Sequence, residues 1–123
     1  MKILLIEDIR IERKKIKHWL EQIGCEVIEA SNGVEGLERF NSSRPDLVIT
    51  DMVMPEKEGV ELMIELRNTF PDTKIFAISG AGVSRAGEYL PLAKGLGALR
   101  TFAKPIEKGV LLDAIREFFP AGA

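Results

Sequence analysis

The sequence is poor in cysteine and histidine, two side chains that are widely used to bind metals and to carry out nucleophilic catalysis. Cys25 is the only cysteine among the 123 residues, so no disulfide can form within the chain. This cysteine usage is typical of a reducing compartment. His18 is the only histidine and is expected on an exposed helix face, which argues against a histidine-based metal cluster or a Ser-His-Asp triad.

Long apolar runs and a strong excess of one charge are also missing. The N-terminal apolar run, residues 3–6, is too short for a signal peptide and ends in acids. No apolar run approaches the length of a membrane span. The formal net charge of −2 argues against broad nucleic-acid binding. We therefore expect a cytoplasmic protein that binds no membrane and, by itself, no nucleic acid.

The composition is that of an ordinary globular protein, with 46% hydrophobic and 29% charged residues. A chain of this length fits one domain, which we predict to cover residues 1–123. Short apolar runs, which predict buried strands, alternate with stretches of helical periodicity. The expected strands are residues 3–6, 26–30, 46–50, 74–78 and 99–103. The expected helices are residues 10–23, a segment carried by Val34, Leu37 and Phe40 and broken at residues 42–45, then 60–70, about 90–96, and 107–119.

This alternation predicts an α/β fold with a parallel sheet covered by helices on both faces. Five strand–helix units form an open sheet more readily than a closed barrel, which needs eight. We predict a flavodoxin-like, doubly wound (βα)5 fold in which the strands, numbered along the chain, lie in the order 2-1-3-4-5.

Polar side chains stand at the carboxyl ends of four predicted strands, where such sheets bind their ligands. Glu7 and Asp8 follow the first strand, Asp51 the third, Ser79 the fourth and Lys104 the fifth. Three carboxylates, one hydroxyl and one ammonium group are therefore expected to meet in one crevice.

Three carboxylates in one crevice require either a bound proton or a neutralising cation, because like charges about 4 Å apart repel by roughly 4 kcal/mol at an effective dielectric constant near 20. Hard oxygen ligands favour Mg²⁺, which uses one or two carboxylates and shares itself with a phosphate. A metal held by Asp8 and Asp51 would leave positions for that phosphate. Lys104 and Ser79 could contact the other phosphoryl oxygens, with Asp51 as the nucleophile.

These residues resemble the receiver domain of two-component response regulators, the CheY-like family. The resemblance covers residues 2–119 and depends on the joint order and spacing of several short motifs. They are Leu5-Ile6-Glu7-Asp8, Ala30-Ser31-Asn32-Gly33, the run from Asp46 to Pro55, Gly59, Ser79-Gly80, Gly97-Ala98 and Lys104-Pro105.

The resemblance implies a role for each site residue. Asp51 would be the phosphoacceptor, Glu7 and Asp8 the acid pair that positions Mg²⁺ or Mn²⁺, and the backbone carbonyl of Val53 a further metal ligand. Ser79 occupies the Ser/Thr switch position of the family, and Lys104 its lysine. Receivers resembling this one usually have a cis peptide bond before the proline that follows this lysine, here Pro105.

The same resemblance implies a stand-alone or excised receiver that is a signalling module, not an enzyme acting on other substrates. It would catalyse only its own phosphorylation and dephosphorylation. Its expected partners are a sensor histidine kinase or a histidine phosphotransfer protein, and an unknown downstream protein.

Two features depart from the family pattern. Thr101 stands where an aromatic residue or histidine is frequent, and the loop after Ser79 is long, with glycines at positions 80, 82 and 87. Thr101 cannot fill the space that an inward-rotating aromatic ring would occupy. Phe102 is expected on the opposite face of its strand. We therefore expect the loop of residues 80–87 to carry the change in the partner-binding surface on phosphorylation.

Three alternative functions fit the sequence less well. A haloacid-dehalogenase-type phosphatase would need a second acid two residues after Asp51, where Val53 stands. A flavin- or nucleotide-binding protein would need a Gly/Ser/Thr-rich phosphate loop after the first strand, where the sequence has Glu7 and Asp8. A receiver that had lost phosphorylation would not be expected to retain Asp8, Asp51 and Lys104.

Overall fold

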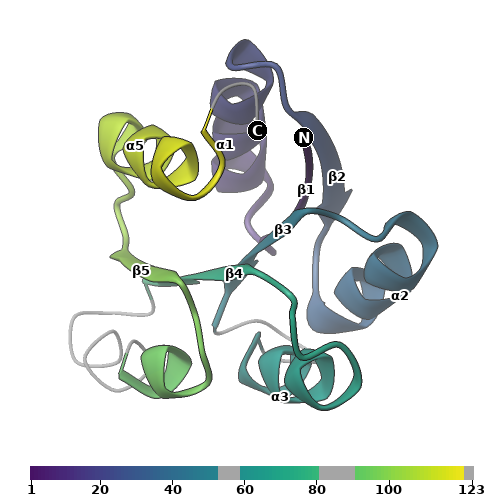
Figure 1. The fold of residues 1–123 in the computed structure, drawn as a ribbon. Coiled ribbons are helices and arrows are strands. Elements are labelled where there is room, and N and C mark those ends of the chain that lie inside the picture. The colour runs from purple at the N-terminus through teal and green to yellow at the C-terminus, as the bar shows by residue number, and fades with distance from the viewer. Residues whose placement is uncertain (53–58, 81–90, 121–123) are drawn as a thin grey trace.

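A five-stranded parallel sheet forms the centre of the molecule (Figure 1). The computed structural model describes residues 1–52, 59–80 and 91–120. The strands lie in the order β2-β1-β3-β4-β5, which confirms the predicted topology. Their bounds are β1 Lys2–Ile6, β2 Glu26–Ala30, β3 Leu47–Asp51, β4 Ile75–Ser79 and β5 Arg100–Ala103.

Helices cover both faces of this sheet. α1 and α5 lie on one face, and α2, α3 and a short helical segment at residues 91–95 lie on the other (Figure 1). The bounds are α1 Arg10–Gln22, α2 Gly33–Ser43, α3 Gly59–Thr69 and α5 Lys108–Phe118. Within the described ranges, every helix falls short of the length and apolar character needed to cross a bilayer.

The core consists of two hydrophobic clusters, one on each face of the sheet. Ile3, Leu5 and Ile49 point to the face covered by α1 and α5, and Leu4 and Val48 point to the other face. β3 and β4 are buried along their whole length, and β1 beyond its first residue. This explains why these strands appear in the sequence as continuous apolar runs.

The bounds of α2 differ from those predicted. Ser42 and Ser43 stay helical, and their hydroxyl groups donate hydrogen bonds to the carbonyl oxygen of Arg39 one turn earlier. The helix ends at Ser43, and the next residue, Arg44, adopts a left-handed backbone conformation with φ of 48°. That residue donates its N–H to Phe40 O at 2.9 Å, which closes the last turn.

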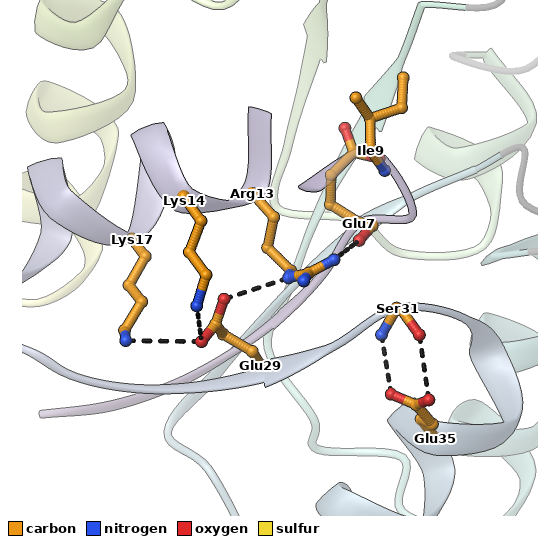
Figure 2. Close-up of polar contacts among 8 residues, drawn as sticks. All are labelled: Glu7, Ile9, Arg13, Lys14, Lys17, Glu29, Ser31 and Glu35. Carbon is orange, nitrogen blue, oxygen red and sulfur yellow. Dashed lines mark hydrogen bonds and ion pairs between the residues drawn. The ribbon is translucent and has the colours of Figure 1, made fainter. Parts of the chain in front are cut away.

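The start of α2 is fixed by a reciprocal cap, of which Figure 2 shows the contacts between Glu35 and Ser31. Asn32 Oδ1 accepts the backbone N–H of Glu35 at 2.9 Å. The Glu35 carboxylate in turn accepts the backbone N–H and the hydroxyl of Ser31, both at 3.0 Å. These bonds satisfy backbone donors at the helix start, so that Gly33, predicted as part of a turn, is the first helical residue.

Basic side chains of α1 form ion pairs with β2, an arrangement that we call the clamp. Arg13 Nε and Lys14 Nζ donate to the Glu29 carboxylate at 3.1 and 2.9 Å, and Lys17 Nζ lies 3.4 Å from it (Figure 2). Burial opposes ionisation of this carboxyl group. The bonds from Lys14 and Arg13 outweigh it and lower the pKa of Glu29 to about 2.

We predict that Glu29→Gln lowers the free energy of unfolding at pH 7 by about 1–2 kcal/mol, a value that allows for partial solvent screening. Because the pKa of Glu29 is lower in the folded state, its stabilisation is present above the unfolded-state value of about 4.5 and disappears as the pH falls through about 2. Urea denaturation from pH 7 to pH 2 should show that the difference in unfolding free energy between wild type and Glu29→Gln shrinks as the pH falls from about 4.5 to about 2. Glu26→Gln, an exposed change on the same strand, is the control. An equal loss for both variants would contradict the clamp.

Candidate functional site

The carboxyl ends of β1, β3, β4 and β5 lie at the same edge of the sheet, as the sequence predicts. The parallel register pairs Asp51 with Ile78, and Ser79 with Ala103. Lys104 N donates to Ser79 O at 3.0 Å and so holds the residue after β5 against the end of β4. The predicted site residues 7, 8, 51, 79 and 104 are therefore brought to one edge by backbone pairing alone.

Three acids form a compact cluster at this edge. Glu7, Asp8 and Asp51 each place one carboxylate oxygen within 4.8 Å of those of the other two. Glu7 is fully buried and Asp51 is nearly so, whereas Asp8 is more exposed. The cluster is therefore buried on the side of Glu7 and Asp51 and more open to solvent on the side of Asp8.

Lys104, the residue after β5, extends its side chain into this cluster. Its Nζ lies 2.5 Å from Glu7 Oε1 and donates to Asp51 Oδ2 at 2.9 Å. It also donates to Glu12 Oε2, on α1, at 2.7 Å. The peptide bond between Lys104 and Pro105 is cis, which confirms the prediction made from the family resemblance. One ammonium group thus joins three carboxylates from three elements.

Both expected ways of relieving the repulsion among the acids are present. Burial raises the pKa of Glu7 to about 9; the Lys104 ammonium opposes this shift, and the charge of Asp51 adds to it. This shift favours the protonated form of Glu7, and a metal ion bound at the cluster would oppose it. Burial alone would lower the pKa of Lys104, but its bonds to Glu12, Glu7 and Asp51 outweigh burial and raise it, so the ammonium stays charged.

Two glycines let the backbone approach the site closely. A Cβ atom on Gly80 would overlap the Cβ, Cγ and Cδ atoms of Lys104. A Cβ atom on Gly59, at the start of α3, would overlap the carbonyl oxygen of Asp51. Any larger residue at position 80 would push the lysine stem aside, and one at position 59 would separate α3 from the end of β3.

The polar atoms of the site fit a metal ion and a phosphoryl group. Ser79 is fully buried, and its Oγ has no hydrogen-bond partner in the described part of the chain. A buried hydroxyl without a hydrogen-bond partner costs folding free energy, and a phosphoryl oxygen would accept a hydrogen bond from it. The neighbouring carboxylate oxygens are the ligands that Mg²⁺ prefers. Val53, predicted to add a carbonyl ligand, lies outside the described residues.

Glu12 is a residue of this site that the sequence did not predict. Its carboxylate reaches Lys104, which is 92 positions away in the sequence. The available signal was its place in the first turn of α1, directly after the strand-end acids. Burial opposes its ionisation, but the hydrogen bonds from Lys104 and Glu7 lower the pKa of Glu12.

Neighbouring side chains of β5 point to opposite faces of the sheet, as predicted. Phe102 is buried in the cluster under α1 and α5, where its ring centroid lies 5.5 Å from that of Phe76. Phe102 therefore cannot replace an inward-rotating ring on the side of Thr101. The loop expected to respond to phosphorylation lies outside the described residues from position 81 to position 90.

A family model for the response regulator receiver domain matches residues 3–116. The chain belongs to this family. Among relatives of the receiver, the chemotaxis protein CheY of Halobacterium salinarum is 31% identical over 119 residues, which are 97% of each chain. The sporulation initiation phosphotransferase F of Bacillus subtilis is 28% identical over 97% of this chain and 94% of its own.

Solved structures agree with this assignment. A response regulator receiver domain protein from Clostridium thermocellum superposes with a TM-score of 0.86 and 34% sequence identity. The match covers 94% of this receiver and 91% of that chain. The flavodoxin-like sheet order predicted from the sequence is therefore the receiver fold.

We predict that Gly80→Ala destabilises the receiver by about 1–3 kcal/mol, because the added methyl group meets atoms of Lys104 that lie close to its backbone. Gly109→Ala is the matched control, since a Cβ there meets no atom within 4 Å and lies inside α5. The control should stabilise the fold by about 0.5–1 kcal/mol. Thermal and urea denaturation measure both. A neutral Gly80→Ala would show that the lysine stem moves aside without cost.

Proposed function

We propose that this receiver accepts a phosphoryl group on Asp51 from a histidine kinase or a histidine phosphotransfer protein, in a reaction that requires Mg²⁺ or Mn²⁺. The observation that carries the proposal is the meeting of Asp8, Asp51 and Lys104 at one edge of the sheet. The names of the relatives, a phosphotransferase and a chemotaxis regulator, support the same role.

Each side chain would have a distinct task in this reaction. A carboxylate oxygen of Asp51 attacks the phosphorus atom, and the bond to the donor nitrogen breaks, leaving an acyl phosphate. The Lys104 ammonium group stabilises the negative charge that develops on the phosphoryl oxygens. Ser79 donates a hydrogen bond from its buried hydroxyl to one of these oxygens. Glu7, Asp8, Asp51 and the carbonyl of Val53 would hold the metal ion, which supplies positive charge to the phosphoryl oxygens.

The proposed activity is limited to the receiver itself. It catalyses its own phosphorylation and dephosphorylation and acts on no other substrate. We further propose that residues 1–123 form one such domain, that it acts in the cytoplasm, and that a downstream protein recognises its phosphorylated surface. Binding to membranes, or to nucleic acid by the domain alone, plays no part in this proposal.

The decisive prediction is that the wild-type chain gains one phosphoryl mass when incubated with acetyl phosphate and Mg²⁺. Asp51→Asn should lose this gain entirely, because an amide is a poor nucleophile at this position. A chelator should abolish the gain in the wild-type chain. Intact mass spectrometry measures all three.

The matched control is Asp72→Asn, which makes the same chemical change at an exposed loop position. It should label as the wild type does. Labelling of Asp51→Asn at the wild-type rate would refute the assignment of the phosphoacceptor.

A further prediction concerns the surface that a partner reads. Beryllofluoride, a phosphoryl mimic, should change the amide NMR signals of residues 80–96 more than those of β2. The reason is that Ser79, which directly precedes this segment, has a buried hydroxyl available to the ligand. Thr101 has no ring that could rotate inward when the ligand binds. A response confined to α1 and β2 would contradict this route.

A further inference from the structure

Glu12 contacts the key lysine of the site from outside the acid cluster. Its carboxylate belongs to the first turn of α1, and its Oε2 lies 2.7 Å from Lys104 Nζ. The Glu12 side chain is 33% exposed, whereas the Glu7 and Asp51 side chains are 0% and 5% exposed. Glu12 is therefore the outermost of three carboxylates that share one ammonium group.

An ammonium group has three N–H donors, and here three carboxylates surround it. A phosphoryl group on Asp51 needs at least one of these donors. The bond to Glu12 is the cheapest to give up, because water reaches this carboxylate more easily than the other two. As long as the Glu12 bond persists, it neutralises part of the charge that would hold the phosphoryl oxygens.

We propose that Glu12 is a positioning residue that competes with the phosphoryl group for Lys104 and so weakens the hold of the site on that group. This inference rests on the proposed function of Asp51. Glu12 touches neither the metal nor the reacting atoms in this scheme. It acts through the lysine, by its charge and by its bond.

The competition predicts effects of opposite sign on the two ligands of the site. Without the Glu12 charge, Lys104 pulls more strongly on a phosphoryl mimic, and the mimic meets less repulsion. The same freed ammonium is held by Asp51 and Glu7 alone, and it competes more strongly with a metal ion for their oxygens. A variant that merely loosened the site would bind both ligands less tightly.

The test uses Glu12→Gln, which keeps the shape of the side chain and removes its charge. Glu38→Gln on α2 is the control, because it changes the net charge equally at an exposed position. Two dissociation constants are measured on the 123-residue chain: Mg²⁺ alone, by the fluorescence of Trp19 or by amide NMR shifts, and beryllofluoride at saturating Mg²⁺. Urea denaturation checks that both variants are folded.

We expect Glu12→Gln to bind beryllofluoride roughly threefold to fivefold more tightly and Mg²⁺ about twofold more weakly, as suits one partly exposed ion pair. Glu38→Gln should match the wild type in both. Unchanged or weaker beryllofluoride binding by a folded Glu12→Gln would overturn the competition while leaving Asp51 as phosphoacceptor. Failure of the wild type to bind beryllofluoride at all would overturn the proposed function, and this inference with it.

Discussion

The ammonium group of Lys104 is the interaction on which the site depends. It joins carboxylates from β1, β3 and α1 that would otherwise repel one another at the edge of the sheet. Asp51 is buried, and removing the partner of a buried charge leaves that charge uncompensated, at a cost of several kcal/mol. Burial also raises the pKa of Glu7, which reduces the negative charge that this one cation must offset.

The fold places this cation by pairing strands, not by local contacts. β5 is the last strand in the sheet order, yet its register against β4 sets Ala103 beside Ser79. Lys104 then reaches back across the ends of β4 and β3. The lysine stem passes so close to Gly80 that no side chain fits there. A parallel sheet with its strand ends at one edge is therefore the minimal scaffold on which residues 7, 51, 79 and 104 can meet.

The sequence was sufficient to predict the sheet order and the meeting of residues 7, 8, 51, 79 and 104 at one edge, because strands and strand ends leave patterns that are local in the chain. Buried parallel strands appear as apolar runs, and the polar residue after each run marks a strand end. Contacts between elements carry no such pattern. The sequence around Glu12 and Glu29 indicates no partner for either, and only the packing of α1 on the sheet shows that one meets Lys104 and the other meets Arg13. The end of α2 was misplaced for a related reason, since Ser42 and Ser43 can either break a helix or bond back to it.

The balance of charge at the site explains why its two proposed ligands would bind together. A divalent ion alone must compete with the Lys104 ammonium for the oxygens of Asp51 and Glu7. A phosphoryl group alone would meet Asp8, Asp51 and Glu12 with only one cation to offset them. With both present, Asp8 and Asp51 would hold the metal ion and Lys104 would contact the phosphoryl oxygens, so that each ligand would reduce the repulsion that opposes the other. On the proposed function, this arrangement of acids and lysine would make the binding of the two ligands mutually favourable.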